Sequence, residues 1–162
     1  MLADLRIRAI EPDDSERLNA FFDRLSPDSR RRRFLVTKAR LEEDELTFLT
    51  EVDHVTHEAL VAVDRDGRIV GVSRYVCPRG RPDVAELAVA VADELHRRGI
   101  GRTLARRIVQ RARANGVARL TATSLRENVA ALKLLIGLGF QIRELGYVVA
   151  LDLDLGALRA AA

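Results

Sequence analysis

The segment DVAELAVAVAD (residues 83–93) constrains the fold more than any other, because only Glu86 interrupts its apolar interior. An apolar stretch without alternation predicts a strand near the centre of a sheet. It leads into the turn HRRGIGR (residues 96–102), after which a helix is expected to run to about Asn115, with Gly116 as its stop signal. The helix carries an apolar stripe at a four-residue spacing: Ile100, Leu104, Ile108 and Ala112.

The remaining elements predict one α/β domain over residues 1–162, a sandwich around a mixed sheet. Residues 5–10 alternate as a half-buried strand does, and two apolar runs flank an Asp66-Gly67 hairpin turn. The other expected elements are helices over residues 13–25, from Ser26 onward and over 41–52, a strand at 118–124, a helix at 127–140, and one or two strands in 141–155.

Composition excludes several classes of protein. With 48% hydrophobic and 31% charged residues, the chain has the make-up of an ordinary globular protein. No apolar run reaches the roughly 20 residues of a membrane span, and residues 1–10 lack the apolar part of a signal peptide, so we expect a cytoplasmic protein without a membrane partner. The single Cys77 excludes an internal disulfide. No metal site is expected, although His54 and His57 could share one face of a helix.

The net charge of +3 and the pI near 9.6 point only weakly to an anionic partner. Nucleic acid is the disfavoured choice, because no aromatic residues interleave the basic run Arg30–Arg33. The arginines of the helix after residue 99 lie opposite its apolar stripe, which predicts a solvated face.

The turn at residues 96–102 has two interpretations, an anion cradle or the solvated start of a basic helix. The first helical turn offers unpaired N–H groups, and Gly99 and Gly101 let the backbone approach a ligand. Neither familiar phosphate motif is present, since Leu104 replaces the third glycine of the dinucleotide fingerprint and no Walker lysine follows. The glycines alone leave both interpretations open.

Two motifs resemble those of the GNAT acetyltransferases. HRRGIGR after the apolar strand is similar to the family's acetyl-CoA loop, Q/R-x-x-G-x-G/A, and ENVAALKLLIGLGF is similar to a later block that begins N-x-x-A and ends G-F. The matching positions of that block are Asn128, Ala131, Gly139 and Phe140. The resemblance implies the GNAT fold, an α/β fold whose mixed, mostly antiparallel sheet has six or seven strands and about four flanking helices. It also implies acetyl-CoA as cofactor and acetyl transfer to a primary amine.

Four segments further resemble the catalytic domain of the Pat-type bacterial protein lysine acetyltransferases: LSPDSRRRRF, EVDHVTHEALVAV, IVGVSRY and AELAVAVAD. The likeness implies a protein lysine as acceptor, and a small-molecule amine such as a polyamine or aminoglycoside is the alternative. Acids in residues 41–53 would help recruit a lysine, although acids in a first helical turn also complement the helix dipole. In that group a regulatory domain, in several cases a cyclic-nucleotide-binding one, often accompanies the catalytic domain. The likeness here covers the catalytic domain alone, so such regulation is not carried over. A homodimer stays open because dimers are common in the family.

Glu86 is the expected general base. An amine with a pKa of about 10 needs a proton acceptor, and Glu86 is the only carboxylate inside an apolar strand, where burial would raise its pKa. The family places a catalytic glutamate here, and a strand-end glutamate that faces solvent is the alternative. By the resemblance, acetyl-CoA is bound by the strand, the turn and the start of the later helix: Val89, Val91, Arg97, Arg98, Gly99, Ile100, Gly101, Arg102 and Asn128. Asn128 also fits a simple helix N-cap.

Two positions depart from the family pattern. His96 stands where glutamine or arginine is usual, which affects only fine affinity because the amides of the loop remain. Leu135 stands where many members have a tyrosine that protonates the leaving thiolate, so another group or water must act, the thiolate leaves unassisted, or activity is low. A weakly active acetyl-CoA sensor domain is therefore a further alternative. Tyr75 and Tyr147 are expected to be packing residues, and Cys77 has no base nearby in the sequence to make it a nucleophile.

Overall fold

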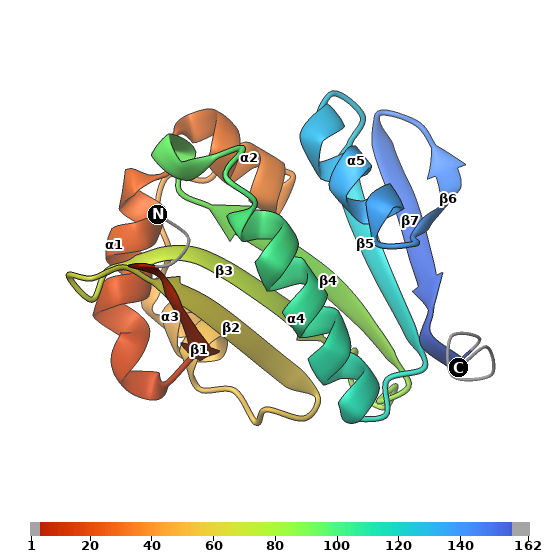
Figure 1. Ribbon diagram of the computed structural model, residues 1–162, viewed down its shortest axis with the longest axis horizontal. Coiled ribbons are helices and arrows are strands. Elements are labelled where there is room, and N and C mark those ends of the chain that lie inside the picture. The colour runs from red at the N-terminus through yellow and green to blue at the C-terminus, as the bar shows by residue number, and fades with distance from the viewer. Residues whose placement is uncertain (1–3, 157–162) are drawn as a thin grey trace.

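A computed structural model describes residues 4–156 (Figure 1). The domain predicted over residues 1–162 also includes 1–3 and 157–162, which lie outside the described residues. Seven strands form one sheet in the order β1-β2-β3-β4-β5-β7-β6. They are β1 (Arg6–Ala9), β2 (His57–Val63), β3 (Ile69–Val76), β4 (Val84–Val91), β5 (Arg119–Leu125), β6 (Gln141–Leu145) and β7 (Val148–Asp154). Every neighbouring pair is antiparallel except β4 with β5. The predicted mixed, mostly antiparallel sheet is therefore confirmed.

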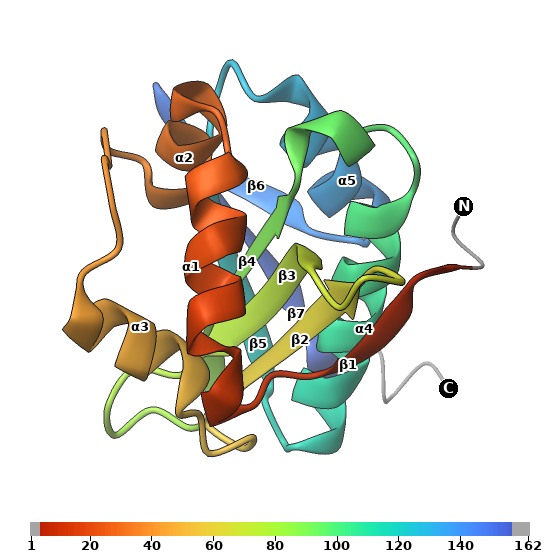
Figure 2. The same ribbon diagram turned by 90° about the vertical axis from the view of Figure 1, so that its left-hand side faces the viewer.

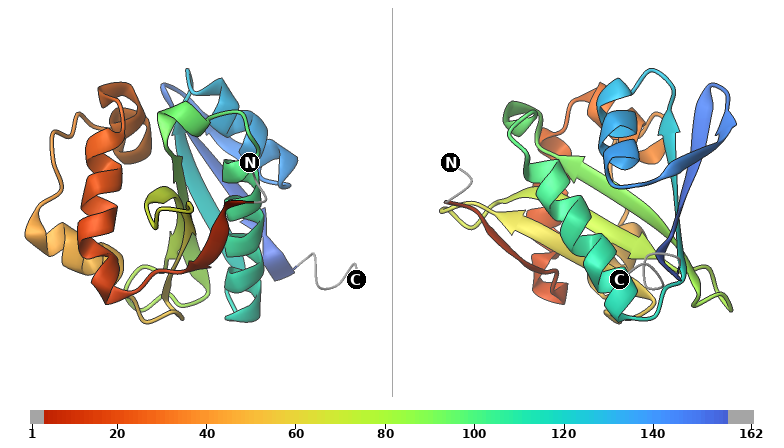
Figure 3. Two further views of the ribbon diagram at one scale, coloured as in Figure 1. Left: turned by 60° about the vertical axis from the view of Figure 1, so that its left-hand side comes forward. Right: turned by 45° about the vertical axis from the view of Figure 1, so that its right-hand side comes forward.

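Five α-helices are present in the described chain, one more than the approximate number expected. They are α1 (Ser15–Arg24), α2 (Pro27–Phe34), α3 (Glu43–Thr50), α4 (Ile100–Ala114) and α5 (Val129–Gly137), with short 3-10 helices at Pro12–Asp14 and Asp93–Leu95. α4 and α5 cover one face of the sheet, whereas α1, α2 and α3 lie on the other (Figures 2 and 3). Within residues 4–156, no helix combines the length and apolar character that crossing a membrane requires.

Local signals in the sequence explain where the helices on the second face begin. α1 buries the predicted stripe of Leu18, Phe21 and Phe22. α2 begins as expected, because the side chain of Ser26 accepts a hydrogen bond from the N–H of Ser29 and a proline follows at the first helical position.

β4 lies at the centre of the sheet, as its apolar run predicts, but it has a partner on both edges for only part of its length. It pairs with β3 from Glu86 to Val91, and with β5 only from Val84 to Glu86. Beyond this point β5 continues along β7 to Leu125, so β4 and β5 separate. The resulting splay opens toward the end of the sheet where α4 and α5 begin (Figure 1).

A buried carboxylate joins β2 to α4 on the first face. Glu58 is fully buried, and its oxygens accept hydrogen bonds from Nδ1 of His54 at 2.7 Å and from the guanidinium of Arg111 at 3.0 Å. Arg111 is exposed, as expected of the solvated face of α4, and its bond to Glu58 also ties α4 to the sheet. Because a buried charge without partners is costly, the network fixes how the two elements pack.

We expect Glu58→Gln to lower the free energy of unfolding by about 2 kcal/mol, because it removes charge-assisted hydrogen bonds from a buried site. Urea denaturation measures this loss. Asp66→Asn is the control, since Asp66 is exposed and its ion pair with Arg68 is a surface pair; it should cost no more than about 1 kcal/mol. Equal effects of the two variants would contradict a structural role for the buried carboxylate.

Candidate active site

The main chain of β4 directs hydrogen-bonding groups into the splay. The carbonyl of Asp83 accepts hydrogen bonds from N–H groups at the start of β5, whereas the N–H of Ala92 bonds to the β3 side. Because these groups alternate between the two edges of a strand, those of Val89 and Val91 face the β5 side beyond the last pair. The splay leaves them without a neighbouring strand among those described. The acetyl-CoA contacts predicted for Val89 and Val91 can therefore be made by their backbone groups.

The turn before α4 presents main-chain N–H groups at the mouth of the splay. Gly99 caps the helix with a φ of 81°, in the left-handed region that favours glycine. Arg97 shares this conformation at 62°. The side chain of Ile100 is buried, so only its main chain is available to a ligand. The first N–H groups of a helix have no intrahelical partner, and the helix dipole makes this end favourable for anions.

Gly101 keeps the groove between α4, β4 and α5 open. A Cβ at this position would lie 3.5 Å from Cγ2 of Val91 and 3.7 Å from Cδ1 of Leu134, so a longer side chain would fill the groove. His96, which departs from the family motif, turns back toward β4, where its Nε2 donates to the carbonyl of Val91 at 2.8 Å. The carbonyl of Val91 is therefore engaged within the protein, and Val89 offers the freer pair of backbone groups.

Two cavities meet at the splay and share part of their walls. The larger, of about 450 Å³, lies between the turn and α5, and the smaller, of about 210 Å³, lies between β4 and β5. The residues that line both are Arg32, Arg33, Val89, Asn128, Ala131 and Leu134. Every residue predicted to bind the cofactor lines the larger cavity except Arg98, which lines a separate opening with Arg24 and Arg68.

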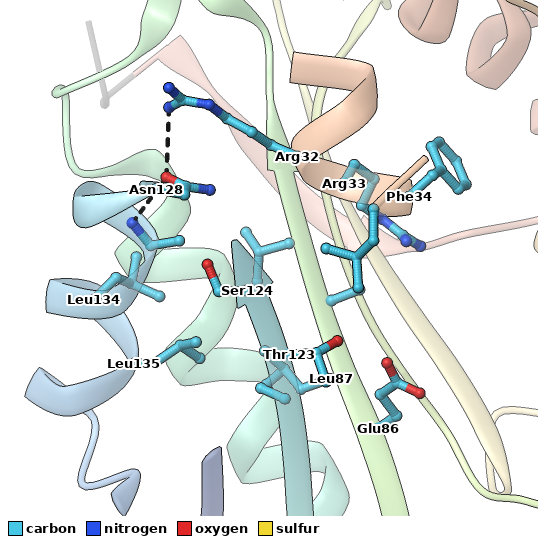
Figure 4. Close-up of a pocket in the computed structure, with 15 residues that line it drawn as sticks. Arg32, Arg33, Phe34, Glu86, Leu87, Thr123, Ser124, Asn128, Leu134 and Leu135 are labelled. Atoms are coloured by element: carbon cyan, nitrogen blue, oxygen red, sulfur yellow. Dashed lines mark hydrogen bonds between the residues drawn. The ribbon is translucent and has the colours of Figure 1, made fainter. Parts of the chain in front are cut away.

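Asn128 and Leu135 form the wall of the cavities opposite β4 (Figure 4). Asn128 caps α5, because its Oδ1 accepts a hydrogen bond from the N–H of Ala131 at 3.3 Å. The predicted capping role is therefore confirmed. Leu135 is buried at 5% exposure and lines the smaller cavity, where Thr123 and Ser124 contribute hydroxyl groups.

Glu86 lies on the other side of β4, away from α5 (Figure 4). Its side chain is exposed, so the burial expected from its apolar neighbours is wrong. Alternation along the strand explains this, since Ala85 and Leu87 point to the opposite face and are the buried residues. The exposure of Glu86 agrees with the alternative expectation, a glutamate that faces solvent. Glu86 nevertheless lines the smaller cavity.

Helix α2 crosses the open end of the splay and is held at both of its ends. At its start, the carboxylate of Asp93, just after β4, accepts hydrogen bonds from the hydroxyls of Ser26 at 2.8 Å and Ser29 at 2.9 Å. Near its end, Arg32 donates to Oδ1 of Asn128 at 3.5 Å (Figure 4). Sequence reasoning treated Arg30–Arg33 only as a charge run and missed that Arg32 and Arg33 line both cavities. The expected helical spacing could have shown that four consecutive arginines point in different directions.

A buried arginine and a neutral histidine lie next to β4 on the α2 face. Arg74 is 4% exposed and donates to the carbonyl of Leu49 at 3.0 Å and to Nε2 of His57 at 2.9 Å. Burial, together with the positive charge of the neighbouring Arg74, lowers the pKa of His57 to about 4. Burial also lowers the pKa of Arg74 to about 9, with Arg33 as the second cause.

The structure also shows the surroundings of the other histidines, tyrosines and cysteine that the sequence singled out. His54 and His57 do not share a helix face, since one precedes β2 and the other lies in it, and their nitrogens contact different partners. Tyr75 is a packing residue as expected, whereas Tyr147 is 69% exposed, which corrects that expectation. Burial raises the pKa of the Cys77 thiol, so its surroundings do not activate it as a nucleophile.

The sequence profile described as the acetyltransferase (GNAT) family matches residues 18–140. The chain belongs to this family. An acetyltransferase from Pseudomonas aeruginosa is 34% identical over 139 residues, which cover 83% of this chain and 73% of the relative. Acetyltransferase Pat from Mycolicibacterium smegmatis is 32% identical over 139 residues, which cover 82% of this chain but only 40% of Pat.

Solved structures confirm the predicted GNAT fold. The GNAT domain of S. lividans PAT matches with a TM-score of 0.86 and 30% identity, covering 93% of this chain and 90% of that domain. The structure of yncA, a putative acetyltransferase from Salmonella typhimurium with its cofactor acetyl-CoA, has a TM-score of 0.74. At 18% identity, with 94% of each chain covered, that second likeness shows the fold. As a GNAT family member, the protein is an acetyl-CoA-dependent N-acetyltransferase.

We expect Gly99→Ala to weaken acetyl-CoA binding, measured by calorimetry, because a Cβ strains the left-handed turn that aims the α4 N–H groups. The strain should also cost about 1–2 kcal/mol of stability. Gly67→Ala is a matched control: Gly67 has a φ of 80° in the hairpin between β2 and β3 and no atom near an added Cβ. It should lose similar stability and keep wild-type affinity. A similar loss of affinity in both variants would contradict the local role of the turn.

We expect the stability of the GNAT domain to fall as the pH drops from about 6.5 to about 4. His57 binds its proton with a pKa of about 4 in the native state, against an ordinary value of 6.5. Between these values the unfolded chain binds more protons, so this histidine removes up to about 1.4 kcal/mol of stability per pH unit as the pH falls. His57→Gln should flatten this part of the pH profile in thermal unfolding, and an unchanged slope would show that another group is responsible.

Proposed function

We propose that this GNAT enzyme transfers the acetyl group to the side-chain amine of a protein lysine. The observation that carries the proposal is the splay between β4 and β5, with main-chain donors on one side and Glu86 on the other. We also propose that residues 1–162 act as one acetyltransferase domain in the cytoplasm. A homodimer stays a prediction.

The splay fits acetyl-CoA, which supplies a thioester as the acetyl donor. The turn at residues 97–102 would hold the pyrophosphate through N–H groups at the start of α4, with Arg97 and Arg102 exposed beside them. Backbone groups of Val89 would pair with the extended arm, and Asn128 lines the cavity opposite. The groove that Gly101 leaves free gives that arm its path between α4 and α5.

Glu86 would act as the general base for the acceptor amine. An ammonium with a pKa of about 10 must lose a proton before it can attack, and Glu86 lines the smaller cavity on the side away from the turn. Its exposure lets the proton pass to solvent, directly or through water. The donor and the acceptor would then approach the splay from opposite faces of the sheet, which brings the amine and the thioester together.

The protein-lysine acceptor is supported by likeness and by the surface beside this face. Both Pat relatives are similar across most of this chain, and the sequence resembles the protein lysine acetyltransferases. In α3, Glu45 is used in a capping box and an ion pair with Lys38, but Glu43 and Asp44 stay exposed. A small-molecule amine remains the alternative acceptor.

Leu135 favours a second candidate, a weakly active domain that binds acetyl-CoA as a sensor. No acidic side chain faces the smaller cavity from the described part of α5, and the hydroxyls of Thr123 and Ser124 are the polar groups contributed there by β5. Tight acetyl-CoA binding with negligible release of CoA, whatever amine is offered, would favour the sensor.

We expect Glu86→Gln to lower kcat by about 10²–10⁴-fold at neutral pH, the usual contribution of a general base. CoA release is measured with lysine-bearing proteins and with small amines from pH 6 to 9, and mass spectrometry locates the acetyl-lysine. Affinity for acetyl-CoA should stay at the wild-type level, because Glu86 lies away from the α4 turn. Full turnover of the variant across this range would remove Glu86 as the base, and acetylation of small amines alone would replace the lysine acceptor.

A further inference from the structure

The four consecutive arginines of α2 differ in what they contact. Arg30 donates to three backbone carbonyls, those of Asp23, Leu25 and Ala39. Arg31 contacts the carboxylates of Asp28 and Glu127 and the hydroxyl of Tyr147, and Arg32 donates to Asn128. These three side chains anchor α2 to α1, to the following loop and to the far side of the splay.

Arg33 is the exception in this run. Among residues 4–156, its guanidinium makes no hydrogen bond or ion pair, and it lies over the ring of Phe34 at 4.7 Å. The side chain is half-buried and lines both cavities. Figure 4 shows it on the same side of β4 as Glu86. A cation that is partly removed from water without a partner is unfavourable unless a ligand supplies one.

Positive charge exceeds negative charge around this position. Burial lowers the pKa of Arg33 while Glu86 opposes that shift, which places the two groups within electrostatic reach without a direct ion pair. Arg74 is close enough to be affected by Arg33, and His57 beside it is neutral at pH 7. Two guanidinium groups, those of Arg33 and Arg74, therefore influence each other on this face, and Glu86 is the carboxylate that acts on Arg33.

This balance of charge is unfavourable for a lone ammonium group and favourable for an amine that brings its own anion. We infer that the acceptor carries a carboxylate close to its amine, and that Arg33 binds this carboxylate. In a protein this means a lysine with an aspartate or glutamate nearby in the bound segment. The inference rests on the proposed lysine acetyltransferase function and specifies its substrate class.

The position of Arg33 favours the acceptor over the cofactor as the source of the anion. The turn arginines Arg97 and Arg102 line only the larger cavity, whereas Arg33 also lines the smaller cavity together with Glu86 and lies within its electrostatic reach. The hydrogen bonds of Asp93 to Ser26 and Ser29 fix α2 against the end of β4. A guanidinium held in this way can bind a carboxylate through two parallel hydrogen bonds.

The test uses lysine peptides in matched pairs that differ by one glutamate or glutamine, placed at each of the two positions before and after the lysine. Acetylation kinetics are measured for the wild type, Arg33→Gln, Arg33→Lys and Arg107→Gln. Arg107 is an exposed arginine on α4 and serves as the charge-matched control. A second arm compares free amino acids with their carboxamides, which separates a small-molecule source of the carboxylate from a protein source.

We expect the wild type to prefer the glutamate peptide of at least one pair by about tenfold in kcat/KM, mainly through KM. Arg33→Gln should bring this ratio close to one, Arg33→Lys should keep part of it, and Arg107→Gln should keep all of it. Equal rates for both members of every pair in the wild type, or a preference that survives in Arg33→Gln, would overturn the inference. If Arg33→Gln does not fold, the inference is still tested by the ratio of kcat/KM between the two peptides of each pair, measured for the wild type and for Arg33→Lys.

Failure of the inference is distinguishable from failure of the proposed function. Acetylation of lysine peptides without any carboxylate preference leaves the function intact and removes the role of Arg33. If no peptide is acetylated, the proposed lysine acceptor fails. In that case the role of Arg33 is tested by the comparison of free amino acids with their carboxamides and by equilibrium binding of the peptide pairs to the CoA-saturated protein. Equal affinities for the glutamate and glutamine peptides of every pair would overturn that role.

Discussion

The separation of β4 from β5 beyond Glu86 is the constraint on which the rest of the site depends. Three register pairs join the two strands, and each strand then follows its other neighbour. A central strand is thereby left with backbone groups that no adjacent strand satisfies. Unpaired backbone groups in a protein interior need a partner, and in the proposed function the extended arm of acetyl-CoA supplies it. In the proposed function, the α4 turn at the same end of the sheet binds the pyrophosphate.

Helix α2 helps to line both cavities at this opening, whose two faces differ. It is bound to Asp93 at the end of β4, and through Arg32 it reaches Asn128 at the start of α5. The helix therefore contacts both arms of the splay. The polarity of the two faces also differs, because main-chain N–H groups lie on the α4 side, whereas Glu86, Arg33 and Arg74 lie on the α2 side. In the proposed function, the strand itself therefore separates the acetyl donor from the acceptor.

Much of the fold could be predicted from the sequence because its signals are local. Helix caps such as Ser26, the stop at Gly116 and the unbroken apolar run of β4 depend on neighbouring residues alone, and each predicted element is present. The turn at residues 97–102 was also identifiable, since its glycines follow that run directly. The environment of Glu86 was not, because its exposure depends on where β5 leaves β4, and Arg98 faces a different opening from the other turn residues.

The sequence by itself determined the order of elements, the family and the position of the glycine turn before α4, since these rest on periodicity and short motifs. Only the tertiary structure decided which of four adjacent arginines makes no hydrogen bond or ion pair within residues 4–156, that His96 engages the carbonyl of Val91, and that Arg111 pairs with a buried carboxylate. These properties arise from contacts between residues far apart in the chain. A charge run looks uniform in sequence, but packing gives each side chain its own surroundings.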